Sequence, residues 1–191
     1  MPFIKVNNLK KIYQYDDYAV LYDLSFDIDR GQVTTLIVGK GCGKTTIAKI
    51  FVGVEQKTQG DIFFDDIPIE NLPPKDRKIA FISIPSIYDK GKVQDNVIYG
   101  LLVRGVKKKD AQSIALPILK QYNLDDKMEQ KVKTLSTLDK TKLDFARAFT
   151  RSVDLLILDG CFGKNAQIDD FLTTEIAKRQ QDGCADRKSV V

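Results

Sequence analysis

The stretch Gly39-Lys40-Gly41-Cys42-Gly43-Lys44-Thr45-Thr46 decides how this chain of 191 residues is interpreted. It follows a short apolar run, Thr34 to Val38, and it leads into a segment, Thr45 to Val52, whose apolar residues recur at helical spacing. A buried strand, a glycine loop and a helix are therefore expected in succession. In parallel sheets, strands buried on both faces have continuous apolar runs of this kind.

The glycine loop has the composition of a phosphate-binding loop. Glycines let the backbone curl so that several N–H groups point at one anion in front of a helix N-terminus. Lys44 would reach the β- and γ-phosphates, and the Thr45 hydroxyl would ligate Mg²⁺. The full motif has four residues between its first glycine and the Gly-Lys pair, whereas three separate Gly39 from Gly43. Either one residue has been lost or Val38 replaces the first glycine. The alternative is a simple glycine turn followed by a lysine.

The composition is that of a globular protein, with 43% apolar and 29% charged residues and a net charge of +4. The lysines are scattered, so no nucleic-acid partner is expected. No apolar run is long enough to cross a membrane, and the N-terminus lacks the pattern of a secretory signal. The three cysteines form no CxxC pair and indicate a reducing compartment. The absence of histidine removes the commonest general base.

The remaining segments predict an α/β fold. The first thirty residues and the stretch from Asp61 to Ile69, broken at Asp65-Asp66 and Pro68, indicate half-polar strands of an antiparallel sheet with one open face. Val153 to Leu158 is a second run that is apolar except for Asp154, and it predicts a buried parallel strand. Residues 85–151 have helical periodicity, with a kink or a helix start expected at Pro117.

Several further segments, in a fixed order, resemble the ATP-binding cassette (ABC) family, the nucleotide-hydrolysing subunits of membrane transporters. The similarity is greatest to importers of sugars and other small solutes. The segments that carry it, besides the glycine loop, are Leu9-Lys10-Lys11-Ile12-Tyr13, Asp23-Leu24-Ser25-Phe26, Gly31-Gln32-Val33, residues 72–80, residues 95–101, Leu135-Ser136, Phe145-Ala146-Arg147-Ala148 and Val153 to Asp159.

The resemblance implies ATP and Mg²⁺ as cofactors. Tyr13 would stack on adenine, Ser136 would open the family signature, and Thr45 and Asp159 would hold the metal ion. The residues expected to bind the nucleotide are Tyr13, Gly39, Lys40, Gly41, Cys42, Gly43, Lys44, Thr45, Thr46 and Ser136.

The sequence departs from the family at the residues that carry chemistry. Gly160 stands where the family has a catalytic glutamate, and Cys161 replaces a proline. Thr137 and Leu138 replace the two signature glycines. No glutamine lies near Ser83, and no histidine is present. We therefore expect no catalytic residue in the family's sense and little or no ATP hydrolysis.

The resemblance implies a P-loop NTPase core with a mostly parallel sheet, an antiparallel β subdomain and a helical subdomain over about residues 85–150. The whole chain, 1–191, would be one nucleotide-binding domain that lacks its C-terminal part. Membrane-embedded transport subunits and a second ATP-binding subunit, identical or different, would be its partners. It would lie in the cytoplasm, peripheral on the inner face of the cell membrane. The alternatives are a non-hydrolysing regulatory module or the remnant of a decayed ATPase gene, and a small kinase or GTPase. The last has no support, since the sequence lacks an Asn-Lys-x-Asp segment and an arginine-rich lid.

Overall fold

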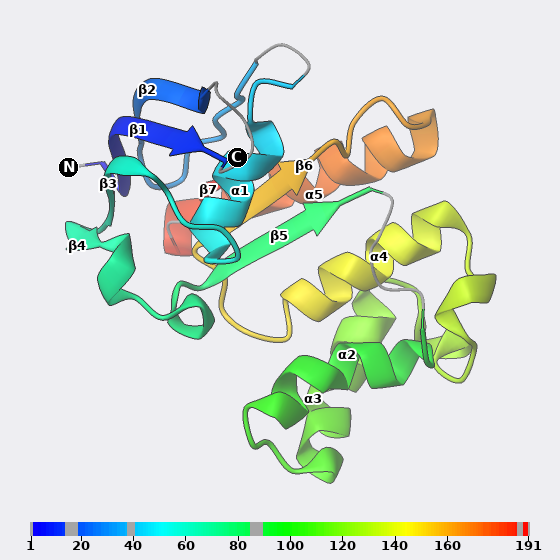
Figure 1. The fold of residues 1–191 in the computed structure, drawn as a ribbon. Coiled ribbons are helices and arrows are strands. Elements are labelled where there is room, and N and C mark those ends of the chain that lie inside the picture. The colour runs from blue at the N-terminus through cyan, green and yellow to red at the C-terminus, as the bar shows by residue number, and fades with distance from the viewer. Residues whose placement is uncertain (1, 14–18, 38–40, 85–89, 187–188, 191) are drawn as a thin grey trace. The chain divides into compact units, whose positions relative to one another are not determined.

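The computed structural model describes residues 2–13, 19–37, 41–84, 90–186 and 189–190. They divide into two compact units (Figure 1). Unit 1 comprises Met1–Phe81, Asp154–Asp159 and Thr174–Val191, and unit 2 comprises Ile82–Val153 and Gly160–Thr173.

Unit 1 contains an antiparallel sheet whose strands follow the order β2-β1-β3-β4. Its strands are β1 (Ile4–Ile12), β2 (Ala19–Ile28), β3 (Gln59–Phe64) and β4 (Ile67–Pro68). Ile4 and Val6 of β1 are buried whereas Lys5 between them is exposed. The sheet therefore buries one face and leaves the other open, as the alternating pattern predicts.

The turn between β3 and β4 forms where the sequence predicted a break. Asp65 and Asp66 have φ angles of 45° and 63°, and Phe64 pairs directly with Ile67. A two-residue hairpin loop with both residues left-handed is the type I′ turn, whose twist matches that of the flanking strands. Aspartate tolerates this conformation better than most residues.

Helix α1 (Lys44–Val52) packs its buried side chains into the core of unit 1. It begins after Gly43 and ends before Gly53, and both glycines are left-handed. Phe51 contacts Phe26 and Phe64 through ring-to-ring packing. The buried residues of this core are Phe3, Ile4, Val6, Leu9, Leu21, Ile28, Ile47, Ala48, Ile50, Phe51, Ile62, Phe64, Ile69, Ile79, Leu155 and Ile157.

A second sheet has the strand order β5-β6-β7, from β5 (Ile79–Ser83), β6 (Leu155–Asp159) and β7 (Ser189–Val190). β6 and β7 are parallel. Leu155, Leu156 and Ile157 are all buried, which confirms the buried strand predicted from the apolar run at Val153 to Leu158. Helix α5 (Ala166–Asp186) lies between β6 and β7 in the chain.

The strand predicted at Thr34 to Val38 is wrong for the residues that the structure describes there. Residues 34–37 form no strand, and Ile37 is 90% exposed. Leu36 is partly buried against the core of unit 1. The segment thus buries alternate side chains on one side only, whereas the continuous apolar run had indicated burial on both sides. Val38 lies outside the described residues.

Unit 2 is built on α2 (Val93–Val103), α3 (Lys108–Gln121) and α4 (Thr137–Ala148), and two 3₁₀ turns, Asp125–Lys127 and Val132–Thr134, lie between α3 and α4. The aromatic rings of Tyr122, Phe145, Phe149 and Phe171 pack against one another in its core. Residues 160–173 also belong to this unit, although the expected subdomain boundaries of about 85–150 leave them out.

Helix α3 continues through Pro117, so the helix start predicted there is wrong. A proline inside a helix removes one hydrogen bond to the residue four positions earlier. Ala115 and Leu119, on either side of Pro117, are buried in unit 2, and this packing holds the helix together across the missing bond. Among the described residues, no helix is both long and apolar enough to span a membrane.

Candidate nucleotide-binding site

The described part of the glycine loop has the backbone that a phosphate cradle requires. Gly41 and Gly43 have φ angles of 83° and 78°, a region that L-residues with a Cβ rarely adopt. A Cβ at Gly43 would also lie 2.9 Å from the Val20 carbonyl oxygen, whereas a Cβ at Gly41 would meet nothing within 4 Å. Gly43 is therefore required by both conformation and space, and Gly41 by conformation alone. Gly39 and Lys40 lie outside the described residues.

The loop leads directly into the N-terminus of α1. None of the described side chains caps this end of the helix, and its first turn carries no acidic residue. The backbone N–H groups of Lys44, Thr45 and Thr46 thus face the loop with the positive end of the helix dipole behind them. Lys44 and Thr45 are exposed and Thr46 is buried. This is a ready-made environment for a phosphate group.

The two predicted metal ligands meet in unit 1, although 114 residues separate them in the sequence. Helix α1 lies beside β6 (Figure 1), and the Thr45 hydroxyl donates a hydrogen bond of 2.5 Å to Oδ2 of Asp159 at the end of β6. In the described part of the chain, no cluster of three metal-ligating side chains is found. One carboxylate and one hydroxyl suit Mg²⁺, which is usually held by few protein oxygens together with phosphates and water.

Tyr13, the predicted adenine-stacking residue, lies next to the same helix turn. Its hydroxyl is 3.3 Å from the Thr46 hydroxyl, and either oxygen can donate. The Lys11 ammonium nitrogen is 4.7 Å from the centroid of the Tyr13 ring. The structure therefore brings Tyr13 together with the described loop residues, Thr45 and Asp159 in unit 1.

Ser136 belongs to unit 2, where it caps α4. Its Oγ accepts a 3.0 Å hydrogen bond from the backbone N–H of Asp139, whose carboxylate pairs with Lys127 at 2.8 Å. Thr137 and Leu138 form the first turn of α4. They stand at the two positions where the family signature has glycines.

The first residue after β6 is Gly160, which has no side chain. Gly160 has a φ angle of 61°, and a Cβ built there would meet nothing within 4 Å. Cys161 is buried, and its thiol donates a 3.4 Å hydrogen bond to the Ile82 carbonyl within unit 2. Residue 160 thus lacks a proton acceptor, although the space around it is open.

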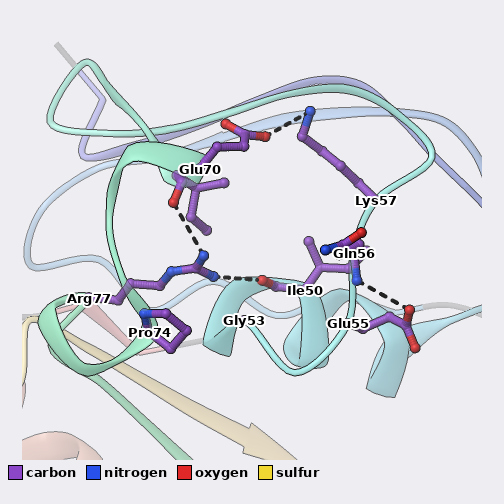
Figure 2. Close-up of a pocket in the computed structure, with 9 residues that line it drawn as sticks. Ile50, Gly53, Glu55, Gln56, Lys57, Glu70, Pro74 and Arg77 are labelled. Atoms are coloured by element: carbon purple, nitrogen blue, oxygen red, sulfur yellow. Dashed lines mark hydrogen bonds and ion pairs between the residues drawn. The ribbon is translucent and has the colours of Figure 1, made fainter.

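A pocket of about 510 Å³ lies at the opposite end of α1 from the glycine loop (Figure 2). Lys57 pairs with Glu70 at 2.8 Å, and the Arg77 guanidinium donates to backbone carbonyls of Ile50 and Phe51. The charged groups that line this pocket are therefore engaged with the protein itself. The pocket is best explained as the junction at which Arg77 anchors the C-terminal end of α1.

Sequence reasoning assigned no role to Lys11, Glu55 or Arg77. The signal for Lys11 was present, because it lies on β1 two residues after the buried Leu9, at a position where the alternation predicts an inward side chain. A charged residue at an inward position indicates a buried partner. The sequence pattern alone does not identify that partner.

A glycine loop at the N-terminus of α1, beside a parallel strand that ends in an aspartate, places the chain in the P-loop class of nucleotide-binding folds. A family model described as "ABC transporter" matches residues 21–163. The chain therefore belongs to the ABC transporter family.

Two known proteins illustrate the relationship. The "sn-glycerol-3-phosphate import ATP-binding protein UgpC" of Psychromonas ingrahamii is 31% identical over 160 residues, which cover 83% of this chain and 43% of that protein. The chain thus spans less than half the length of this relative. The structure of cbiO1 from Clostridium perfringens, part of the ABC transporter complex cbiONQ, superimposes with a TM-score of 0.78 at 20% identity. That match covers 99% of this chain and 77% of the other, and it shows the fold.

Proposed function

We propose that this chain is an ATP-binding subunit of an ABC transporter, which binds ATP with Mg²⁺ at the glycine loop and the end of β6. The contact between Thr45 and Asp159, 2.5 Å long and adjacent to the left-handed glycines, carries the proposal. A hydroxyl and a carboxylate from distant parts of the chain meet where the metal ion of a nucleotide would lie beside a helix N-terminus.

Each part of the site has a separate task in this proposal. The loop from Gly39 to Thr46 surrounds the phosphates with backbone N–H groups, and Lys44 adds a positive charge. Thr45 and Asp159 would hold Mg²⁺, which would neutralise part of the phosphate charge. Tyr13 stacks on the adenine base. Ser136, at the start of α4, contacts the nucleotide of a second ATP-binding subunit.

We propose further that bound ATP turns over slowly. Gly160 offers no group to orient or deprotonate water, and Thr137 and Leu138 replace close-approach glycines. Removing one preorganised transition-state contact typically costs about 10²–10³ in rate. We therefore expect the chain to bind ATP and to hydrolyse it only slowly. The subunit would contribute to transport by binding and releasing nucleotide.

The partner would be a membrane-embedded transport subunit, which docks on α2. Tyr99, Leu102 and Val103 are exposed by 62%, 38% and 69%, and their i, i+3, i+4 spacing places them on one face of this helix. UgpC is named as an import protein and cbiO1 as part of a transporter complex. The chain would then lie in the cytoplasm at the inner face of the membrane. Sedimentation with bare lipid vesicles that contain no transport subunit would contradict partner-mediated docking.

The test is a titration with ATP and Mg²⁺ followed by calorimetry, in parallel with an assay of phosphate release. We expect saturable binding that Lys44→Ala weakens at least tenfold, with little phosphate released. Lys49→Ala is the matched control, since Lys49 is an exposed lysine in the last turn of the same helix. Absence of ATP binding in the wild type would refute the proposed function. Turnover at an ordinary transporter rate, abolished by Lys44→Ala, would refute slow hydrolysis alone.

A further inference from the structure

Lys11 is a buried lysine with an unusual set of neighbours. It is 9% exposed, and its ammonium donates hydrogen bonds of 2.7 Å to Oε1 of Glu55 and 2.8 Å to the carbonyl of Gln56. An ammonium group removed from water needs such partners to remain charged. The hydrogen bond from Lys11 also holds the pKa of Glu55 below its ordinary value, so Glu55 is a carboxylate at neutral pH.

The same ammonium lies over the ring of Tyr13. Its nitrogen is 4.7 Å from the ring centroid, which is within the range of a cation–π interaction. The Tyr13 hydroxyl reaches the Thr46 hydroxyl at 3.3 Å. The ring is thus held on one face by Lys11, while the Tyr13 hydroxyl contacts Thr46 in the first turn of α1 and hydrogen-bonds to Glu55.

These contacts form a continuous connection within unit 1. Glu55 lies just after α1, Lys11 lies on β1, and Thr46 belongs to the first turn of α1 behind the glycine loop. With one face of Tyr13 occupied by a fixed cation, a base can stack on the opposite face. The ring would otherwise have to be immobilised when the base arrives, at a cost in conformational entropy.

We propose that Lys11, fixed by Glu55, is a positioning residue that holds Tyr13 in place to stack on the adenine base. This inference rests on the proposed function, because it concerns the base-recognising part of the same site. The Lys11 ammonium is engaged with Glu55, Gln56 and the Tyr13 ring, so we expect its contribution to be confined to ligands that carry a base.

The experiment compares ATP with inorganic tripolyphosphate, each with Mg²⁺, because the second ligand has phosphates and no base. Stacking of a base on an aromatic side chain supports about a tenfold to hundredfold gain in affinity. We expect Lys11→Met to weaken ATP about five- to thirtyfold and to change tripolyphosphate affinity less than twofold. Lys11→Arg, which keeps a cation, should recover most of the loss. Glu55→Gln should act in the same direction as Lys11→Met, by a smaller factor.

Lys10→Met is the matched control, since Lys10 is the preceding residue of β1 and lies 5.4 Å from the ring of Tyr22 instead. It should leave both affinities unchanged. In the Tyr13→Leu background, Lys11→Met should have no further effect on ATP. A purely structural role predicts instead that both ligands weaken equally and that the effect persists without Tyr13, and either result would overturn the proposal. Wild-type protein that binds neither ligand would refute the proposed function and not this inference specifically.

Discussion

Replacing Arg77 with methionine tests whether the C-terminal end of α1 is anchored as the structure indicates. Nη1 of Arg77 donates to the carbonyls of Ile50 at 3.0 Å and Phe51 at 2.8 Å. Nε donates to Leu72 at 2.9 Å, and Nη2 donates to Ile69 at 3.2 Å. The carbonyls in the last turn of a helix have no partner within the helix. One guanidinium therefore joins the end of α1 to the two 3₁₀ turns that follow β4.

The expected cost can be worked from these four bonds. The net contribution of a typical intramolecular hydrogen bond to stability is about 0.5–1.5 kcal/mol. Arg77 is half-buried, and the Ile50 carbonyl also accepts a bond from Gly53, so the lower values apply. Methionine keeps the length of the side chain but has no donor. We expect Arg77→Met to lower the free energy of unfolding by about 2–4 kcal/mol.

Urea unfolding followed by circular dichroism measures this change, and the melting temperature should fall by roughly 5–15 °C. Arg104→Met is the control, because Arg104 is exposed and donates a 2.8 Å bond to the Gly100 carbonyl within its own helix. That variant should stay within about 0.5 kcal/mol of wild type. If Arg77→Met were equally harmless, the anchoring role assigned to Arg77 would be wrong.

Three further predictions concern the loop, the turn after β6 and the ion pair at β1. Gly41→Ala should lower the free energy of unfolding by about 1 kcal/mol, because residue 41 has a left-handed backbone. Gly43→Ala should lower it by more, because the new Cβ would also clash with the Val20 carbonyl oxygen; equal urea midpoints for the two variants would contradict this. Gly160→Glu should fold at a cost of about 1 kcal/mol without restoring ordinary ATP turnover, and robust phosphate release would count against it. The pKa of Glu55 is lowered in the folded state, so the ion pair stabilises the fold above pH 4.5, and this stability is lost as the pH falls through the folded-state pKa of Glu55. The free energy of unfolding of wild type should therefore exceed that of Glu55→Gln by a constant amount above pH 4.5; a difference that shrinks between pH 7 and pH 5 would contradict this.

Much of unit 1 could be predicted because each of these sequence patterns is compatible with only one kind of local structure. The apolar run from Leu155 to Leu158 is short and is bounded by Asp154 and Asp159, and it forms β6. The break at Asp65-Asp66 is a turn because these residues tolerate left-handed backbone. The strand predicted at Thr34 to Val38 is wrong, because an apolar composition predicts burial but does not specify which neighbouring strand the segment would pair with. The described residues there form no strand.

Individual site residues could be predicted from sequence motifs, but some contacts between their side chains could not. Thr45 and Asp159 were assigned to one metal ion from separate motifs, and the structure brings them to 2.5 Å. Lys11 was visible as a charge on a strand, but its partner Glu55 is 44 residues away, and no local pattern connects the two. Long-range side-chain pairing depends on tertiary packing, which sequence periodicity does not encode.

The different surroundings of Cys42 and Cys161 have a practical consequence. Cys42 is exposed within the glycine loop, whereas Cys161 is buried and bonded to a carbonyl. Thiol reagents act on accessible cysteines, so a maleimide should label Cys42 far faster than Cys161. In a Cys184→Ser background, the labelling rate becomes a direct readout of loop occupancy. Nucleotide protection could then be followed in crude membranes, without purification and without introducing a foreign probe site.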